Sequence, residues 1–340
     1  MGERSSEARE AQHAEEPFRV LTNEDGLTPI TPTSGPCLEF EFPGLRVGVA
    51  EYAEGPTGCT VLDFASRARC EVDVRGGAPG LYGGYGMADA IFFAGGSLYG
   101  LEVGAGIAAE ILHRRGNARW GNLACVSGAI IYDFGVRESL CYPDKTLGRA
   151  ALRAAAEGRF PLGQCGAGRS ATVGKIVGSQ RFAAEPGGQG AAVQAYGSLI
   201  VGVFTVVNSV GAVLDGSGGV LRGFLDRQTG RRLRLQEILA ECPEACAAVA
   251  EPTGGNTTVS AVVVNQKLSP YELRQLARQV HSAMARVIQP FHTINDGDVM
   301  FALSVGDDVP RLNVMVIGEM AAELACTAVR SAVAPDRRPS

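Results

Sequence analysis

The sequence predicts a layered α+β fold, and two observations carry that prediction. A strongly β-branched segment at residues 258–265 is followed by a well-capped helical segment at residues 269–287. Elsewhere, strand-like and helix-like segments are mixed without the regular alternation that builds a doubly wound parallel sheet. With 340 residues, the chain is long enough for one large core or two modest domains.

The first half of the chain opens with an arm at residues 1–36 that is polar, contains proline and is expected to be flexible. Gly116 is expected to end a helix that follows a glycine-dense region. A further helix is expected at residues 146–157, with Thr146 as its N-cap. Short apolar or alternating segments predict strands at residues 46–52, 60–64, 71–74, 90–94 and 123–132.

In the second half, residues 198–215 predict two strands with Asn208 between them. Ser269 as N-cap, with Pro270 and Glu272 after it, predicts the start of the helix at residues 269–287. The remaining expectations are a loop at 222–234, a helix at 235–249 that Pro243 kinks or divides, strands at 299–305 and 312–316, and a closing helix at 319–333.

Composition narrows the possible functions. The net charge is −5 and no long Lys/Arg block occurs, which argues against a nucleic-acid partner. Nine scattered cysteines without a CxxC pair fit a reducing compartment, and the first residues lack an apolar signal, so we expect a cytoplasmic protein. The apolar run at 198–213 is too short and too interrupted to span a membrane. No cofactor motif is credible, because the glycines at 104 and 106 fall inside a helix candidate.

The most informative motif is the stretch GGNTT, which ends in Asn256, Thr257 and Thr258 immediately before a strand. Two glycines allow unusual backbone conformations, and a hydroxyl residue follows them. This arrangement suits autoproteolysis, in which the hydroxyl attacks the preceding carbonyl and water cleaves the resulting ester. The new N-terminal threonine then has an α-amine, with a pKa of about 7.7–8.0, that can act as its base. From spacing alone, a plain glycine turn entering a strand is the commoner explanation of such a motif.

A second constellation is the segment HTINDGD, in which Asp296 and Asp298 flank a glycine before a strand. Two carboxylates can hold a hydroxyl and an ammonium group. The alternatives are a plain Asp-Gly turn or a calcium loop. A calcium loop of the EF-hand type would need an oxygen ligand and a glycine where Met300 and Phe301 stand. His281 is expected to be a surface or satisfied core histidine. The chain has four histidines, so few candidates exist for the histidine of a Ser-His-Asp triad.

These blocks resemble the autoprocessed L-aminopeptidase/D-esterase family of N-terminal-nucleophile hydrolases, and within it the nylon-oligomer hydrolase branch. The resemblance runs from about residue 38 to about residue 333. It is carried by blocks such as RGGAPGLYGGY, AGGSLYGLEVGAG, AGRSATVGK and GNTTVSAVVVN. It implies a four-layer αββα sandwich built jointly by a large fragment at residues 37–256 and a small fragment at residues 257–340. It also implies a homotetramer of cleaved units.

The resemblance implies roles for individual residues as well. Thr257 is the expected nucleophile and Asn256 the residue left at the new C-terminus. Asp296 and Asp298 are expected to contact the threonine hydroxyl and amine. The other expected site residues are Lys175, which positions the nucleophile, Asn208, an oxyanion donor, and Tyr132, close to the site. No cofactor and no metal are expected.

Four functions remain open at this point. The first is hydrolysis of linear 6-aminohexanoate-type oligoamides, and the second is an aminopeptidase or amidase for short or β-amino peptides. A substrate panel separates these two. The third is an acetyltransferase of the ornithine type, and transfer to an amine would identify it. The fourth is a non-enzymatic ligand-binding protein, and an uncleaved chain without amidase activity would favour it.

Overall fold

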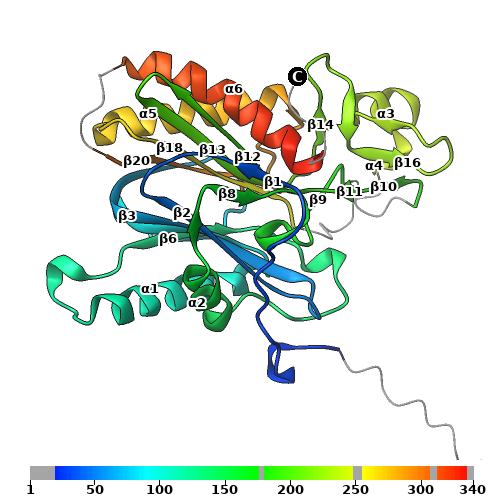
Figure 1. The fold of residues 1–340 in the computed structure, drawn as a ribbon. Helices are drawn as coiled ribbons and strands as arrows, with labels where there is room; N and C mark the ends of the chain where they lie inside the picture. The colour runs from blue at the N-terminus through cyan, green and yellow to red at the C-terminus, as the bar shows by residue number, and fades with distance from the viewer. Residues whose placement is uncertain (1–19, 176–179, 248–254, 307–311, 335–340) are drawn as a thin grey trace, which may run out of the picture.

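The computed structural model describes residues 20–175, 180–247, 255–306 and 312–334. Four layers are stacked in it: two helices, a sheet, a second sheet and two more helices (Figure 1). The upper helices are α5 (Pro270–Ala283) and α6 (Val314–Val333), and the lower helices are α1 (Glu102–Arg115) and α2 (Lys145–Arg153). The predicted α+β class and the four-layer arrangement are thereby confirmed.

A ten-stranded sheet supplies both inner layers. Strand β3 (Thr57–Val74) belongs to both of them, because its register with β5 shifts between Asp63 and Ala68. The order of neighbours is β12 (Gly188–Tyr196), β13 (Leu199–Asn208), β18 (Thr257–Val264), β20 (Val299–Ser304), β3, β5 (Met87–Ala94), β6 (Val126–Ile130) and β4 (Leu81–Tyr82), with β2 (Leu45–Tyr52) also beside β3 and β7 (Ala156–Glu157) beside β2.

Three cores fill the three spaces between the layers. Val262 and Met300 pack under α5 and α6, whereas Val259 and Phe301 of the same two strands pack between the two sheets. This alternation is what a strand buried on both faces requires. A third core lies between the second sheet and helices α1 and α2. Each fully buried Val or Phe side chain contributes about 1.5–3 kcal/mol of transfer free energy.

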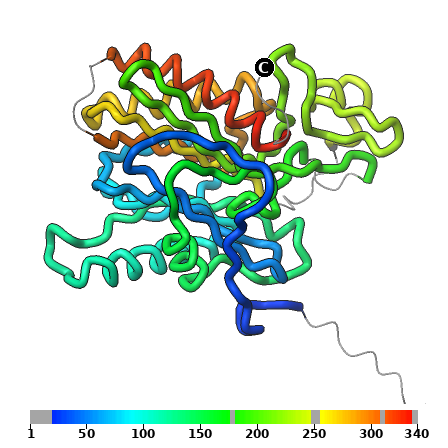
Figure 2. The backbone as a smooth tube through the Cα atoms, in the orientation of Figure 1, coloured from blue at the N-terminus to red at the C-terminus, as the bar shows by residue number. Residues whose placement is uncertain are grey.

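A small lobe projects from one end of the sandwich, at the right of Figure 2. It has its own cluster around Phe182, Phe224 and Ile238. Its elements are β10 (Phe182–Ala183), β14 (Ala212–Leu214), β15 (Val220–Arg222), β16 (Phe224–Asp226), β17 (Arg232–Leu233), α3 (Leu235–Glu241), α4 (Glu244–Ala247) and β19 (Ile288–Gln289). Short two-stranded pairs, β1 (Cys37–Glu39) with β8 (Arg159–Pro161) and β9 (Thr172–Val173) with β11 (Glu185–Pro186), complete the described strands.

Several sequence expectations were wrong in detail. Residues 57–74 form one long strand rather than separate strands at 60–64 and 71–74, because the chain bends within the strand. Asp144, not Thr146, caps α2, accepting the Leu147 N–H at 2.9 Å. Residues 312–316 start helix α6 behind the N-cap Asn313, so they form no strand. The expected loop at 222–234 contains the short strands β16 and β17.

Other expectations held or extend beyond the described residues. Pro243 separates α3 from α4, as its missing N–H predicts, and the expected end of that helix at 248–249 lies outside the described residues. Strand β12 had no sequence prediction. The first nineteen residues of the expected arm also lie outside, while Ile30 exchanges two backbone hydrogen bonds with Glu51. No helix among the described residues is long and apolar enough to cross a membrane.

Candidate active site between the two sheets

Strand alternation brings two of the predicted site residues to the same gap. Val259 of β18 packs between the sheets, and Thr257 has the same parity two residues earlier, at the first position of the strand. Asn208 ends β13 and is paired directly with Thr257 across the sheet. Both side chains are fully buried. The expected nucleophile therefore lies at one mouth of the inter-sheet space.

The carbonyl oxygen of Asn256 is the focus of the site. The hydroxyl of Thr257 donates a hydrogen bond to it, and the backbone N–H of Gly297 donates a second at 2.9 Å. A parallel bridge between Asn256 and Asp296 fixes this register. This oxygen belongs to the peptide bond between Asn256 and Thr257. Its carbonyl thus has both an adjacent hydroxyl and a backbone donor at the distance expected of an oxyanion contact.

The chain just before the Asn-Thr pair lies so close to Tyr132 that position 255 must be a glycine. A Cβ at this position would lie 1.5 Å from Cβ of Tyr132, so no other residue fits without moving the chain. Tyr132 follows β6 in the opposite sheet, and its carbonyl accepts the side-chain N–H of Asn208 at 2.8 Å. Tyr132 therefore forms one wall of the site. Gly254, the other glycine of the motif, lies outside the described residues.

Lys175 and Asn208 form a pair that holds the segment before the bond between Asn256 and Thr257. The Lys175 ammonium donates to the backbone oxygen of Asn208 at 3.0 Å, to its Oδ1 at 2.8 Å and to the Gly255 carbonyl at 3.1 Å. Asn208 Nδ2 also donates to the Gly255 carbonyl, at 3.2 Å. These donors therefore lie on the carbonyl of Gly255, one residue before Asn256, and Gly297 supplies the donor on the Asn256 carbonyl itself.

Burial shifts the protonation of the site. It lowers the pKa of the Lys175 amine to about 7, although the negative charges of Asp296 and Asp133 act in the opposite direction. Burial also raises the pKa of Asp296, and the charge of Asp298 adds to that rise. Asp133 follows Tyr132 and is buried against Arg137. Burial raises its pKa, while Arg137 and Lys175 oppose the shift.

The two aspartates anchor different parts of the site. Oδ2 of Asp296 accepts the backbone N–H and the hydroxyl of Thr293, at 2.8 and 2.7 Å. Oδ1 of Asp298 accepts the backbone N–H of Thr258 at 2.7 Å. Both carboxylates are fully buried. Asp298 thus holds the residue that follows the expected nucleophile, while Asp296 braces the loop that presents the Gly297 N–H.

A second segment, which follows the end of β3 beside the start of β20, clamps this loop. The N–H of Ala78 donates to the Asp296 carbonyl at 2.9 Å, and that of Arg75 donates to the Asp298 carbonyl at 3.1 Å. Gly76 lies so close that a Cβ there would approach the Asp296 carbonyl oxygen to 2.2 Å. The glycine-dense sequence that starts at Arg75 therefore has a specific use, which is close backbone contact with the aspartate loop.

Sequence reasoning identified the residues that meet here but missed some of their partners. Thr257, Asn256, Lys175, Asn208, Asp296, Asp298 and Tyr132 all gather at this mouth of the inter-sheet space. The Gly297 N–H and the contact of His292 with Asp298 were not assigned beforehand. A backbone donor has no side-chain signature, and His292 stood in the quoted HTINDGD segment without a role. His281 is a buried core histidine whose Nδ1 pairs with Asp73 at 3.0 Å, while its Nε2 is buried without a hydrogen-bond partner among the described residues.

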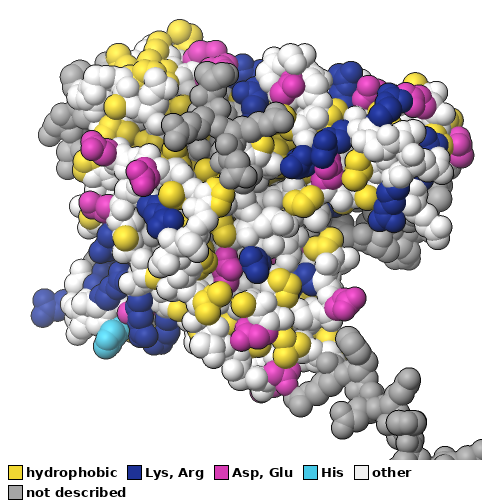
Figure 3. Space-filling view, turned by 45° about the vertical axis from the view of Figure 1, so that its right-hand side comes forward, with side chains coloured by type: hydrophobic (Ala, Val, Ile, Leu, Met, Phe, Trp, Pro, Cys, Tyr) yellow, Lys and Arg dark blue, Asp and Glu magenta, His cyan; other side chains and the backbone are white. Residues whose placement is uncertain are grey.

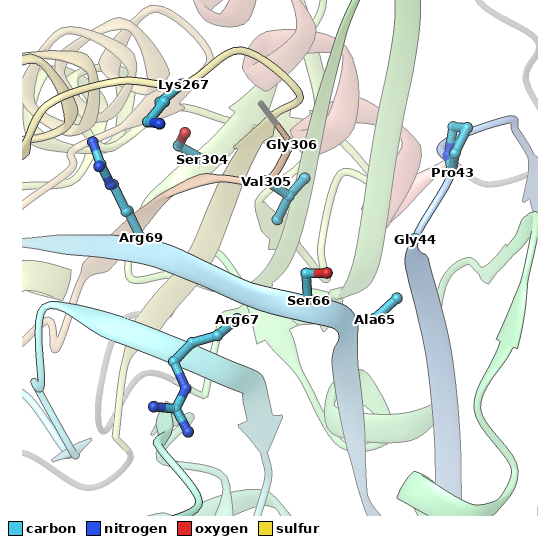
Figure 4. Close-up of a pocket in the computed structure, with 10 residues that line it drawn as sticks. All are labelled: Pro43, Gly44, Ala65, Ser66, Arg67, Arg69, Lys267, Ser304, Val305 and Gly306. Atoms are coloured by element: carbon cyan, nitrogen blue, oxygen red, sulfur yellow. The ribbon is translucent and has the colours of Figure 1, made fainter. Parts of the chain in front are cut away.

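Two other features bear on ligands. The cavity in Figure 4, of about 310 Å³, lies beside Ser304 and Gly306 at the far end of β20 from Asp298, so it does not belong to this site. Arg69 and Lys267 point toward each other there, while Arg67 turns away to pair with Asp89. In the part of the chain that the structure describes, no three His, Cys, Asp or Glu side chains are grouped as metal ligands. The face in Figure 3 shows acidic and basic side chains interspersed over most of its area.

Comparison of the sequence with known proteins gives one family. The profile of peptidase family S58 matches residues 41–335. The 6-aminohexanoate-oligomer endohydrolase of Kocuria sp. (strain KY2) is 44% identical over 320 residues, 90% of this chain and 88% of that protein. The enzyme of the same description from Paenarthrobacter ureafaciens is 45% identical over 323 residues, with the same coverage. An uncharacterized aminopeptidase of Mycobacterium tuberculosis is 35% identical over 250 residues, 69% of each chain.

Solved structures resemble the fold at low sequence identity. The L-aminopeptidase D-Ala-esterase/amidase of Ochrobactrum anthropi, described as a variant of the Ntn hydrolase fold, superposes with a TM-score of 0.64 at 18% identity. It covers 90% of this chain and 88% of its own. A β-aminopeptidase of Burkholderia sp. gives a TM-score of 0.61 at 19% identity, covering 88% and 87%. These similarities concern the fold.

Proposed function

Since the chain belongs to peptidase family S58, we propose that it is an amide hydrolase that first cleaves itself between Asn256 and Thr257 and then uses Thr257 as its nucleophile. The observation that carries this proposal is the pair of contacts on the Asn256 carbonyl oxygen, from the Thr257 hydroxyl and from the Gly297 N–H. A hydroxyl against the preceding carbonyl, with a backbone donor at 2.9 Å on the same oxygen, is what an acyl shift needs.

Self-cleavage takes two steps in this proposal. Oγ1 of Thr257 bonds to the Asn256 carbonyl carbon, and the Gly297 N–H stabilises the negative oxygen that forms. The C–N bond then breaks as the Thr257 nitrogen takes a proton, which leaves an ester between Asn256 and the threonine oxygen. Water cleaves the ester and gives an Asn256 carboxylate and a free Thr257 amine.

Substrate hydrolysis repeats this chemistry with a different carbonyl. The Thr257 oxygen attacks the substrate amide, the substrate amine leaves with a proton, and water releases the acid from the acyl-enzyme. The free α-amine of Thr257, with a pKa of about 7.7–8.0, can take the hydroxyl proton near neutral pH. Lys175, Asn208, Asp296, Asp298 and Tyr132 surround the reacting group and are proposed to bind or orient it.

We expect the purified protein to separate under denaturing conditions into two fragments. The smaller should contain the 84 residues that follow Asn256, and its N-terminal sequence should read Thr-Thr-Val-Ser. Intact-mass measurement and Edman sequencing test this directly. A single 340-residue species that persists after long incubation at neutral pH would refute self-cleavage.

For the substrate, we propose linear oligoamides of the 6-aminohexanoate type. The support is the 44–45% identity, over nine-tenths of the chain, to two enzymes named 6-aminohexanoate-oligomer endohydrolase. The second candidate is an aminopeptidase for short or β-amino peptides, which the 35% identity to a mycobacterial aminopeptidase favours. Chromatography of products from a 6-aminohexanoate tetramer and from N-terminal β-amino dipeptides separates the two. Cleavage of the dipeptides alone would reject the oligoamide assignment.

Lys175 should make self-cleavage sensitive to pH near neutrality. Its three acceptors use all three N–H donors of an ammonium group, whereas a neutral amine has only two. Because burial lowers its pKa to about 7, the charge is lost as pH rises through that value. The cleavage rate of wild-type protein should therefore fall as pH increases from about 6 to about 8. Lys175→Met should be slow and flat over the same interval.

The measurement is the rate of appearance of the small fragment after a pH jump, followed by mass spectrometry. A wild-type rate that instead rises through pH 7, with the rise absent in Lys175→Met, would give Lys175 the role of a base.

The assembly and compartment are part of the same proposal. The two fragments, residues 37–256 and 257–340, would stay together because β18 and β20 of the small fragment lie between β13 and β3 of the large one. We propose a homotetramer of such cleaved units in the cytoplasm. All nine cysteines are free, which is consistent with a reducing compartment. Light scattering of the processed protein tests the tetramer.

A further inference from the structure

We propose that His292 is a positioning residue that fixes Asp298 and, through it, the backbone of the nucleophile. The inference rests on the proposed function, because it concerns the geometry of the same threonine. It assigns a role to a side chain that touches neither the scissile bond nor the nucleophile.

His292 binds one carboxylate oxygen twice. Its backbone N–H lies 3.1 Å from Oδ2 of Asp298, and its Nδ1 lies 2.9 Å from the same atom. With its proton on Nδ1, the ring donates to the carboxylate, which fixes the tautomer. Oδ1 of Asp298 is then left for the Thr258 N–H, at 2.7 Å. The carboxylate is thus held at both oxygens, and its orientation is set from the His292 side.

The backbone of His292 is in an unusual conformation. Its φ is +59°, in the left-handed region, and Ser97 is the other non-glycine residue with positive φ in the described chain. In this conformation the N–H and the ring of His292 both contact the same oxygen of Asp298, where the chain turns into the aspartate loop. Non-glycine residues in this region are concentrated at sites where surrounding structure enforces the conformation.

A second histidine supports the ring of His292 from behind. His281 of α5 meets it edge to face, with ring centroids 4.4 Å apart. Nδ1 of His281 lies 3.0 Å from Asp73, which also binds Arg75 at 2.6 Å. Burial lowers the pKa of His281 against the opposing effect of Asp73, so a neutral ring faces His292. The support therefore runs from β3 and α5 to the aspartate loop.

This chain of contacts ends one residue after the nucleophile. Side chains alternate along β20, and the even-numbered ones face the helices. Asp298, just before this strand, therefore faces the helix layer where His281 and His292 lie, while Thr257 faces the gap between the sheets. The contact with the Thr258 N–H is what links the two sides. A shift of about 1 Å at a reacting group can cost on the order of 10²-fold in rate, so a loosened Asp298 should slow self-cleavage without removing it.

Three substitutions separate donor, shape and backbone. Asparagine and aspartate have the same size and both tolerate the left-handed region, but only asparagine offers a donor to Asp298. Glycine accepts the backbone conformation and removes the side chain. The readout is the rate of appearance of the small fragment, with thermal unfolding as a check that each variant folds, and wild-type protein alongside.

We expect His292→Asn to process within about threefold of wild type and His292→Asp and His292→Gly to be slower by about 30- to 100-fold. Because the ring is 18% exposed, added imidazole should enter the space in His292→Gly and recover part of the rate. If the glycine variant does not fold, the Asn and Asp pair decides alone. Equal rates in all variants, or an asparagine variant as slow as the aspartate variant, would overturn the inference. A wild-type chain that never cleaves would instead overturn the proposed function.

Discussion

Thr257→Ala should remain a single 340-residue chain and should show no amide hydrolysis, while it folds like the wild type. The hydroxyl that lies against the Asn256 carbonyl is missing in this variant, and without it neither the acyl shift nor the acyl-enzyme can form. Both activities should fall below the detection limit, since self-cleavage and hydrolysis have no other attacking atom. Intact mass, unfolding temperature and product analysis provide the three measurements.

Matched variants separate the hydroxyl from the shape of the side chain. Thr257→Val keeps the β-branched shape in a fully buried strand position but lacks the hydroxyl, so it should be as inactive as alanine. Thr257→Ser keeps the hydroxyl and should retain part of both activities. Thr258 is the neighbouring control: its hydroxyl is buried without a partner among the described residues, so Thr258→Val should cleave normally. Hydrolysis by the alanine variant, or a cleavage site moved to 257/258, would contradict the assignment.

The sequence predicted the layers better than their boundaries. β-branched alternation in residues 258–265 and the cap at Ser269 located β18 and α5 because both signals are local. Residues 57–74 were divided into two predicted strands, since the bend that moves β3 from one layer to the other depends on its partners β2, β5 and β20. Strand β12, with Gly188 and Gly190 packed against the backbone of neighbouring segments, has too few β-branched residues to be recognised from sequence.

The site residues, like the strands, could be predicted from the sequence only where a local motif marks them. Thr257 and the two aspartates stand in recognisable motifs, whereas Lys175 and Asn208 were placed by resemblance and have no local signal of their own. The contact between the Gly297 N–H and the Asn256 carbonyl depends on the parallel bridge between Asn256 and Asp296, which are 40 residues apart in sequence. Such a contact arises only when β18 and β20 pair, so no local pattern could have predicted it.

The site also has a cost in stability that the pKa shifts reveal. Burial and the neighbouring Asp298 raise the pKa of Asp296 above that of an unfolded chain. The folded state therefore binds more protons than the unfolded state in the interval between the two values, and ionised Asp296 opposes folding above it. Buried groups with pKa values shifted against their charge are typical of functional sites. Removing this charge should therefore harm function without harming the fold.

Asp296→Asn and Asp298→Asn are expected to slow self-cleavage by at least about 10²-fold, but to change stability in opposite directions. In Asp296→Asn, the amide oxygen can still accept both donors of Thr293, the new NH₂ group faces only the distant Val210 N–H at 3.4 Å, and the buried charge is gone, so the unfolding temperature should stay level or rise. In Asp298→Asn, the new NH₂ group must face a donor, either the Thr258 N–H or the two donors of His292, so the unfolding temperature should fall.

Two alternatives for these aspartates make different predictions. If they only form a turn, both asparagine variants should cleave at the wild-type rate, because asparagine has the same turn propensity. If they form a calcium loop, EDTA should stop cleavage in wild-type protein and calcium should restore it. We expect no effect of EDTA, since all four carboxylate oxygens already have protein N–H or O–H groups beside them, the most distant being the Val210 N–H at 3.4 Å from Asp296. Parallel measurement of rate and unfolding temperature in the two variants distinguishes the three cases.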